Sequence, residues 1–522
     1  MTTTAEPEAG ATADPVLGRP FAALMGLVAV AAAVGAGQLV AGLLSPASGP
    51  FLAVGDAAVR VSPQWLVELA KGAFGTADKP VLLAGIAVVV AALAAAGGLA
   101  SRRRPGPGLA VVTAMGTLAM GAVLSSPTFG PLDLTAPAAS LVVGITSFRR
   151  LHELRLRVDQ APTDAARISR RRVLIGTSTA VGAGAVAATG LGAWIGRDVT
   201  GSRDEVTAAL ARAGYQRAPA IPATAESGVP GATPFVTSNA DFYRIDAALR
   251  VPSLTASDWS LRIHGMVDRE LTLSFADLLA RPLVERTITL LCVSNPVGGP
   301  YVSTTNFIGV DLREVLLEAG VSPAADQVLS TSSDGWTAGT PTGVLLEPDR
   351  GALLAIGMNG EALPPEHGFP VRMVVPGLYG YVSATKWVTD IEVTTFAERQ
   401  AYWLQRGWSE KGPIKTGSRI DVPRTSVGAG RVTVAGTAWS QPIGISAVEV
   451  RLDRGPWQPA DMATEVGGDT WRMWRAEIDV PPGEHTLQAR AFDANGTPQT
   501  ADVRDVVPDG ATGYPTVSIS AT

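Results

Sequence analysis

The stretch Thr287-Ile-Thr-Leu-Leu-Cys-Val-Ser-Asn-Pro-Val-Gly-Gly299 contains the only cysteine of the chain, Cys292. Its first five residues are apolar or β-branched, which predicts a short buried strand that ends at the cysteine. Glycines after a strand end let the backbone approach a ligand closely, and a thiolate is a soft ligand suited to a transition metal. Taken alone, a single cysteine is more often an inert core thiol, so its interpretation depends on the rest of the chain.

Two downstream segments place basic residues beside glycines. Glu366-His-Gly-Phe-Pro-Val-Arg372 has His367 and Arg372 on either side of an apolar turn, and the Gly-rich run 375–387 has Lys386 next to its end. Each basic residue alone would be a surface charge, but together they predict a phosphate cradle. Neither segment matches G-x-G-x-x-G or a P-loop, so a dinucleotide or nucleoside triphosphate site is not indicated.

Composition excludes several classes of redox protein. The net charge of −5 over 522 residues gives no reason to expect nucleic-acid binding. One cysteine excludes an intrachain disulfide framework, Cys-rich zinc sites, iron–sulfur clusters held by several thiolates and c-type haem attachment. The chain has four histidines and none lies in an apolar span, which excludes a bis-histidine haem between helices. A redox role for this chain would therefore require a separate electron carrier, either a cytochrome or a quinone-linked protein.

The first 200 residues predict an all-α transmembrane bundle. Several uncharged runs are long enough, or nearly so, to cross a hydrocarbon core of about 30 Å as helices. Leu134–Phe148 is the weakest of them because Pro137 interrupts it, so five spans are expected, with four as the alternative. The spans are Phe21–Leu44, Pro80–Ala100, Gly108–Leu124, Leu134–Phe148 and Val173–Ile195.

Arginine clusters set the expected orientation. They lie between spans two and three (102–104) and between spans four and five (149–172), and the positive-inside rule makes both cytoplasmic. This predicts a multi-pass protein of the bacterial cytoplasmic membrane whose chain after residue 196 is extracytoplasmic. Ser169-Arg-Arg-Arg-Val-Leu174 is consistent with an embedded twin-arginine export signal and equally with a simple basic anchor.

The half of the chain expected to be exported divides into regions that differ in composition and in hydrophobic pattern. Residues 201–233 are rich in Ala, Pro, Thr and Gly, which predicts a linker, and 234–425 alternate short strands with brief helices, as a mixed α+β domain does. Residues 426–510 contain strands of alternating pattern separated by turns, which predicts an all-β, immunoglobulin-like sandwich before a tail at 511–522.

These residues resemble the sulfite oxidase family of molybdopterin enzymes. The cysteine segment, Asp241-Phe-Tyr-Arg-Ile-Asp246, the run 358–372 and Lys386-Trp387 occur in the family's order, and the resemblance extends over about residues 234–505. It implies an oxidoreductase with a molybdenum cofactor (molybdopterin). It also implies that the C-terminal domain is a dimerisation domain, and hence a homodimer.

The resemblance assigns roles to individual residues. Cys292 would be the thiolate ligand of molybdenum and a catalytic residue. Arg244 would reach the metal pocket, and Trp408 falls where the family's eukaryotic members have an active-site tyrosine. The residues expected to bind the cofactor are Asn295, His367, Arg372, Ser383 and Lys386.

The sequence departs from the family around the substrate. Val297 stands where an arginine would follow the cysteine, the C-terminal arginine has no counterpart, and Asp246 replaces a histidine. Fewer cations favour a less charged substrate than sulfite, so we expect oxygen-atom or electron transfer on a small S- or N-oxide. The alternatives are a sulfite oxidase or dehydrogenase that passes electrons to a separate cytochrome, and a membrane-anchored binding protein without cofactor. The retained cysteine and basic residues count against the binding protein.

Overall fold

A computed structural model describes residues 16–44, 48–63, 78–126, 129–159 and 198–522, with four single positions between 64 and 77. The chain forms two compact units, 1–196 and 197–522, each of which is described by itself. The predicted fifth span, Val173–Ile195, and the arginine-rich hexamer at 169–174 lie outside the described residues.

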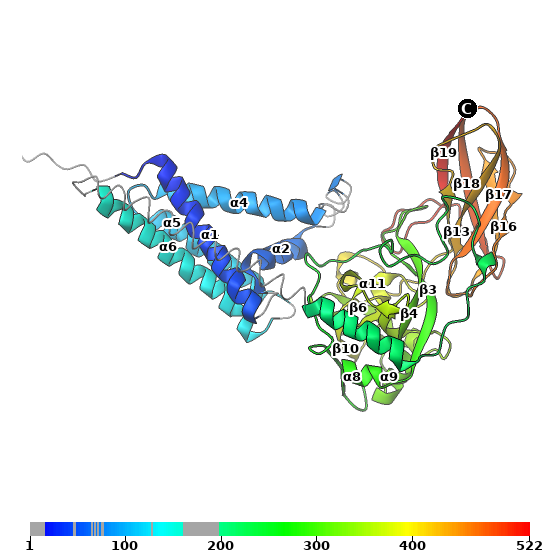
Figure 1. Ribbon diagram of the computed structural model, residues 1–522, viewed down its shortest axis with the longest axis horizontal. Helices are drawn as coiled ribbons and strands as arrows, with labels where there is room; N and C mark the ends of the chain where they lie inside the picture. Colours follow the sequence, from blue (N-terminus) through cyan, green and yellow to red (C-terminus); the bar gives the residue numbers. More distant parts are fainter. Residues whose placement is uncertain are drawn as a thin grey trace, which may run out of the picture. The chain divides into compact units, whose positions relative to one another are not determined.

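The first unit is helical (Figure 1). In its described part, four helices are long and apolar enough to cross a membrane, and each overlaps a predicted span. The fourth, Pro131–Leu154, is longer than the predicted Leu134–Phe148 and contains His152, so the expectation that no histidine lies in a span was wrong there. A shorter helix, α2 (Pro50–Val61), was not predicted and packs on α5. The four long helices are α1 (Arg19–Leu44), α4 (Asp78–Ala100), α5 (Gly106–Leu124) and α6 (Thr135–Asp159).

Small residues allow these helices to approach one another closely. A Cβ on Gly26 of α1 would lie 2.0 Å from the carbonyl oxygen of Ala94 on α4, and one on Gly98 of α4 would lie 2.0 Å from that of Ala22. Neither position can therefore hold a side chain without moving a backbone. Close packing of small residues is typical of helices in lipid, where burial of apolar surface gives little drive for association.

The second unit begins with a helix at 198–213 and contains two sheets of the mixed α+β domain predicted at 234–425, which is the expected catalytic domain (Figure 1). One sheet has the order β3-β4-β7-β8, with β9 paired to β7, and the other has the order β2-β1-β10-β5-β6. The first sheet comprises β3 (Leu283–Leu291), β4 (Val302–Asp311), β7 (Leu353–Met358), β8 (Glu361–Ala362) and β9 (Arg372–Val374). The second comprises β1 (Ser260–Gly265), β2 (Leu271–Ser274), β5 (Gln327–Ser332), β6 (Thr337–Pro341) and β10 (Val388–Thr394).

Short helices connect these strands, and local sequence sets their ends. Ser274 caps α8 (Phe275–Leu279) by accepting a hydrogen bond from the Asp277 N–H. Helix α9 (Leu312–Ala319) ends at Gly320, whose φ of +73° is the left-handed conformation that favours glycine. Two further helices are α10 (Thr342–Leu345) and α11 (Gly380–Ser383).

The segment 201–233, predicted as a linker, instead packs on the catalytic domain. Val206 and Leu210 belong to its buried core, and Arg203 donates to the Leu363 carbonyl at 3.0 Å. The N–H of Gln216 donates to the carbonyl of Leu283 at the start of β3. The Ala- and Pro-rich composition of this segment predicted a flexible tether. Contacts with residues far along the chain instead hold the segment against the domain.

The C-terminal part of the second unit consists of two further sheets, with the orders β11-β13-β17-β16 and β12-β19-β18-β14-β15. The predicted tail at 511–522 instead supplies β19 (Thr516–Ala521), which pairs antiparallel with β18. The first of the two sheets comprises β11 (Gly417–Val422), β13 (Gly430–Trp439), β16 (Asp461–Met462) and β17 (Arg472–Val480). The other strands of the second are β12 (Ser426–Val427), β14 (Ile445–Leu452), β15 (Gln458–Pro459) and β18 (Gly483–Asp493).

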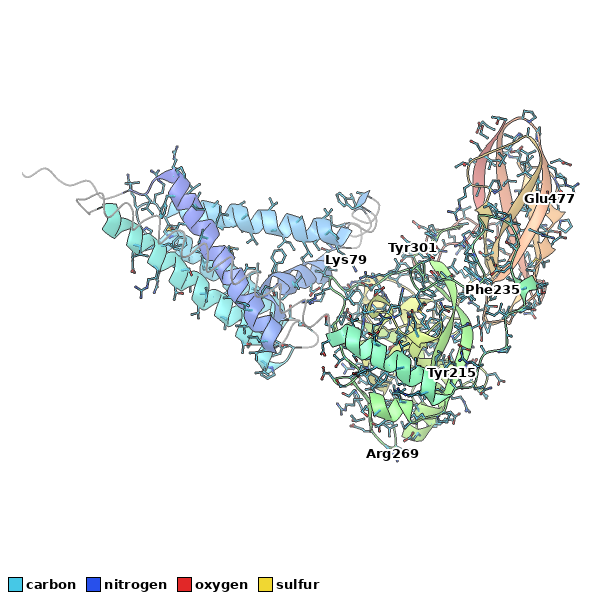
Figure 2. The ribbon with its side chains drawn as sticks, viewed as in Figure 1. Lys79, Tyr215, Phe235, Arg269, Tyr301 and Glu477 are labelled. Carbon is cyan, nitrogen blue, oxygen red and sulfur yellow. The ribbon has the colours of Figure 1, made fainter. Side chains whose placement is uncertain are left out.

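Apolar side chains from both C-terminal sheets form a core of their own. Trp439, Trp471 and Met473, however, are buried in the core of the catalytic domain. Phe235 lies at this junction, where its carbonyl accepts a hydrogen bond from Trp471 Nε1 at 2.9 Å (Figure 2). The two kinds of sheet are therefore joined by shared packing rather than by a flexible connection.

Candidate functional site

Cys292 is the first residue after β3, at the start of a tight loop. Its N–H donates to the Tyr301 carbonyl at 3.0 Å, and its own carbonyl accepts from the Asn295 N–H at 3.0 Å. The Asn295 side-chain oxygen accepts from the Tyr301 N–H at 2.8 Å and closes the loop. A Cβ on Gly299 would lie 2.5 Å from that oxygen, so glycine is needed there. The loop thus presents a half-buried cysteine at a fixed strand end.

The basic residues of the two downstream segments meet in one buried cluster. Arg372 donates to the His367 carbonyl at 3.1 Å, which holds the turn between them, and both side chains are 3% exposed. Lys386 Nζ donates to the Glu366 carbonyl at 2.9 Å. The predicted meeting of His367, Arg372 and Lys386 therefore occurs, through contacts that the sequence separation alone does not specify.

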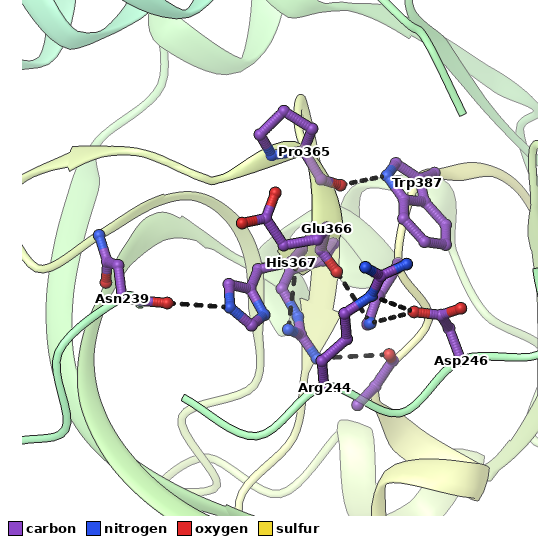
Figure 3. A network of polar contacts seen from close by, with 10 residues as sticks. Asn239, Arg244, Asp246, Pro365, Glu366, His367 and Trp387 are labelled. Carbon is purple, nitrogen blue, oxygen red and sulfur yellow. Dashed lines mark hydrogen bonds and ion pairs between the residues drawn. The ribbon is translucent and has the colours of Figure 1, made fainter. Parts of the chain in front are cut away.

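Asp246 connects this cluster to Arg244 (Figure 3). One carboxylate oxygen of Asp246 accepts from Arg244 Nε at 3.0 Å and from Lys386 Nζ at 3.2 Å. The Asp246 side chain is only 6% exposed and that of Lys386 11%, whereas that of Arg244 is 46% exposed. Asp246 thus ties a solvent-facing guanidinium to a buried ammonium group.

Burial controls the protonation of the cluster. Burial, followed by the charges of Lys386 and Arg372, lowers the pKa of His367 to about 3. Burial also lowers the pKa of Lys386 to about 8, against the opposing effect of Asp246, and that of Arg372 to about 10. His367 is therefore neutral at pH 7, and each cation is held at a cost in desolvation.

The hydrogen bonds identify the tautomer of His367. Its Nε2 lies 3.1 Å from the Asn239 carbonyl, which can only accept, so Nε2 carries the proton (Figure 3). The other nitrogen, Nδ1, is buried and has no hydrogen-bond partner in the part of the chain that the structure describes. Buried polar atoms are rarely left unsatisfied, so Nδ1 is an acceptor available to a ligand.

Aromatic side chains line the neighbourhood of Cys292. The pKa of Tyr243 is raised by burial and by the nearby Cys292 side chain, and Arg372 opposes the shift. Burial, with contributions from Asp509 and Cys292, raises the pKa of Tyr379 to about 12. Both phenols are therefore protonated at neutral pH. Tyr243 responds to the charges of both Cys292 and Arg372, so it links the cysteine loop with the cationic cluster.

Trp408 lies in an adjoining aromatic group. Its ring centroid is 5.8 Å from that of Tyr381 and 6.0 Å from that of Trp403. Trp408 is 5% exposed, and its Nε1 has no hydrogen-bond partner among the described residues. An indole N–H is a donor only, so it is available to an acceptor atom of a ligand.

Two predicted cofactor-binding residues have structural partners. The Ser383 hydroxyl is fully buried and donates to the Tyr379 carbonyl at 2.9 Å within the turn of α11. The Asn295 side-chain oxygen is used inside the cysteine loop. Both residues hold the backbone that shapes the site, and their contact with a cofactor stays a prediction. Sequence reasoning missed Tyr243 and the linking role of Asp246. The only sequence signal for Asp246 was its position two residues after Arg244.

The residues present fit an anionic pterin cofactor. Arg372 and Lys386 are buried cations, and Asp246 is the acid that contacts Lys386. A phosphate supplies the negative charge that such a cluster lacks, and His367 Nδ1 can accept from a ring N–H. Cys292 adds a soft ligand, and the pKa of Tyr243 responds both to it and to Arg372 of the cluster.

Comparison with known proteins agrees with this chemistry. A family model described as oxidoreductase molybdopterin binding domain matches residues 248–403, which include Cys292 and the basic cluster but not Arg244, Asp246 or Trp408. The structure of the sulfane dehydrogenase SoxCD from Paracoccus pantotrophus is similar, with 22% identity, a TM-score of 0.49, and coverage of 59% of this chain and 90% of that chain.

Sulfite oxidases are similar in sequence. Chicken (Gallus gallus) sulfite oxidase is 31% identical over 322 residues, which cover 52% of this chain and 70% of the chicken protein. Human mitochondrial sulfite oxidase is 30% identical over 301 residues, and the match covers 48% of this chain and 55% of the human protein. The chain therefore belongs to the sulfite oxidase family of molybdopterin-dependent oxidoreductases.

Proposed function

We propose that this enzyme reduces a small S- or N-oxide at an extracytoplasmic site, with electrons from a separate carrier. The observation that carries the proposal is the pairing of Asp246 with both Arg244 and Lys386. A dianion such as sulfite needs several unpaired cations to repay its desolvation. At this site the one solvent-facing guanidinium of the cluster already has a carboxylate partner, which favours a neutral oxide.

The chain's residues would then have distinct roles. When bound, the molybdenum cofactor supplies oxygen-atom and electron transfer. Cys292 would be its protein thiolate ligand, and Arg372 and Lys386 would neutralise its phosphate. His367 would accept from the pterin through Nδ1, and Trp408 would donate its Nε1–H toward the substrate oxygen.

Steady-state assays of the full chain in detergent test this function. Dimethyl sulfoxide and methionine sulfoxide would be offered with a reduced viologen dye, and sulfite with ferricyanide as oxidant. We expect turnover of at least one oxide and only slow oxidation of sulfite. Fast sulfite turnover at micromolar concentration would contradict the proposal.

Sulfite oxidation with electron delivery to a cytochrome is the second candidate. It is favoured by the chicken and human relatives, which are sulfite oxidases. The two candidates differ in the charge of the substrate, so the ratio of kcat/KM values for sulfite and for an oxide separates them. A sulfite dehydrogenase would also reduce a soluble cytochrome in the presence of sulfite alone.

We also propose that the apolar helices anchor the enzyme in the bacterial cytoplasmic membrane, with residues after 196 outside. The four long apolar helices support the anchoring. The outward orientation is supported by the arginine clusters together with the predicted fifth span, Val173–Ile195, because five crossings place the two ends of the bundle on opposite sides. Fusions after Thr522 to a periplasmic alkaline phosphatase and to a cytoplasmic fluorescent protein test the orientation. Replacing Arg170 and Arg171 with lysine tests whether export uses the twin-arginine route.

The C-terminal sheets support an immunoglobulin-like sandwich, which we propose as the surface of a homodimer. Two sheets of mainly antiparallel strands with a shared apolar core are the architecture of such a sandwich; the short β12 is the exception and pairs in parallel with β19. Mass measurement of the detergent-solubilised protein tests the dimer. A monomeric mass across a range of protein concentrations would contradict it.

A further inference from the structure

The strand that leads to Cys292 lies at the edge of its sheet. Among the strands that the structure describes, the order β3-β4-β7-β8 gives β3 a neighbour only on the side of β4. An edge strand exposes backbone N–H and carbonyl groups that need partners. Near its start, the outer edge of β3 is covered by Gln216. Near its end, the partners come from the C-terminal sheets.

Thr289 is the point of contact, three residues before Cys292. Its N–H donates to the Asp469 carbonyl at 3.0 Å, and its carbonyl accepts from Gln441 Nε2 at 2.7 Å. Its hydroxyl oxygen accepts from the Trp471 N–H at 2.8 Å. We call these four residues, Thr289, Gln441, Asp469 and Trp471, the Thr289 clamp.

The Thr289 clamp is buried, and its residues are held by hydrogen bonds within the C-terminal sheets and with β4. Thr289 is fully buried, and Trp471 and Gln441 are 1% and 3% exposed. Gln441 Nε2 also donates to the Asp469 carbonyl at 3.1 Å, which ties the two loops of the C-terminal sheets together. On the catalytic side, the Thr289 hydroxyl shares a hydrogen bond with Thr304 of β4.

A second contact reaches the loop beyond the cysteine. A Cβ on Gly298 would lie 3.3 Å from the Pro515 side chain, just before β19. Arg419 of β11 points toward the same loop, with Nη1 3.5 Å from the Gly299 carbonyl. The C-terminal sheets therefore contact the backbone on both sides of Cys292.

We infer that the C-terminal sheets position Cys292 through the Thr289 clamp, in addition to any role in dimerisation. Thr289 lies about 10 Å along the strand from Cys292, so the clamp residues are positioning residues and do not reach a reacting group. The inference rests on the proposed role of Cys292 as the metal ligand. It predicts that the placement of the thiol responds to a change in the clamp.

Alkylation of the thiol in cofactor-free protein tests this directly. Cys292 is the only cysteine in the chain, so labelling by iodoacetamide reports on this thiol alone. Thr289→Val keeps the shape of the side chain but leaves the buried Trp471 N–H without its acceptor. Opening of the strand end should become more frequent, and labelling of the full chain in detergent should be about fivefold faster.

Two variants control for general loosening of the strand. Thr287→Val, on the same strand, removes a hydroxyl that bonds Asn306 of β4 at 2.7 Å and has no part in the clamp, so labelling should stay at the wild-type rate. Thr289→Ser keeps the hydroxyl and should also label as wild type. If Thr289→Val does not fold, Gln441→Met removes the other side-chain contact and should accelerate labelling similarly.

Equal labelling rates in wild type, Thr289→Val and Gln441→Met would overturn the inference. So would equal acceleration by Thr287→Val. In molybdenum-loaded protein, we expect the clamp variants to shift the thiolate-to-metal absorption band and to lower kcat with little change in KM. Because labelling uses cofactor-free protein, its outcome does not depend on which substrate the enzyme accepts.

Discussion

Replacing Asp246 with asparagine should destabilise the protein in a manner that depends on pH. In the wild type, Lys386 is buried against this carboxylate with its pKa lowered to about 8, and Asp246 is the main group that keeps it from falling further. The asparagine side chain has the same shape as the aspartate but no charge. The pKa of Lys386 should therefore fall below 8 in the variant.

The loss in free energy of unfolding has an upper limit, because Lys386 can lose its proton and become neutral. One pKa unit corresponds to about 1.4 kcal/mol, so lowering the pKa from 10.5 to about 8 already costs roughly 3.4 kcal/mol at pH 7. A neutral lysine would cost about 4.8 kcal/mol at pH 7, and about 6.1 kcal/mol at pH 6. The added loss is therefore at most about 1.4 kcal/mol at pH 7 and 2.7 kcal/mol at pH 6.

The sign follows from proton uptake. A lysine whose folded pKa lies below its unfolded pKa binds fewer protons in the native state, so stability falls as pH decreases between the two values. In the variant this decline continues below pH 8, whereas in the wild type it stops there. At pH 9 Lys386 is largely neutral in both proteins, and the difference should vanish.

Thermal unfolding of cofactor-free protein between pH 6 and pH 9 measures this difference. For the roughly 325 residues from 198 to 522, about 1 kcal/mol corresponds to about 1.5 °C in Tm. We expect Asp246→Asn to lower Tm by up to about 4 °C at pH 6, about 2 °C at pH 7 and under about 1 °C at pH 9. The exposed Asp349→Asn variant, with the same change of charge, should show no such trend. A loss of Tm that is constant with pH would refute the coupling between Asp246 and Lys386.

Three further predictions concern single residues of the site. Cys292→Ser should abolish turnover and leave the circular dichroism spectrum unchanged; an active serine variant would overturn the ligand assignment. Because the pKa of His367 is lowered to about 3, the free energy of unfolding should fall as pH decreases from about 6.5 toward 3, by up to about 1.4 kcal/mol per pH unit, and urea titrations should show that His367→Gln removes this slope. Trp408→Phe removes a buried N–H without a partner, so the free energy of unfolding should change by less than about 1 kcal/mol, while kcat/KM for an oxide should fall about tenfold; an unchanged kcat/KM would exclude substrate contact.

Local sequence was sufficient to predict those features of the fold that depend on neighbouring residues. The apolar run before Cys292 predicted the strand end, and β3 ends one residue before the cysteine. The basic residues at 367, 372 and 386 were predicted to lie together because both segments contain glycines and both have a cation at or next to their end. These features depend on residue type and short spacing, which a single sequence displays directly.

Long-range pairing was not predictable in the same way. Asp246 contacts Lys386 across 140 positions of the chain, and the sequence showed only that an acid replaces a histidine near Arg244. Asn295 and Ser383 were expected to meet the cofactor, but each has a hydrogen bond within its own loop. A polar side chain near a site can serve a ligand or the backbone, and only the geometry of its partners distinguishes the two.

At the boundary between the catalytic and C-terminal regions, a change in sequence pattern does not coincide with the edge of a folding unit. Alternating strands after residue 426 mark a change from mixed to all-β structure, and this change suggested a separate module. Trp439 and Trp471 nevertheless fill the catalytic core, and the Thr289 clamp completes the edge of the strand that leads to Cys292. Periodicity reports which face of a strand is buried, but not which neighbour buries it. The proposed role of Cys292 as a metal ligand requires a fixed edge in the strand that leads to it, and residues about 150 to 180 positions further along the chain provide that edge.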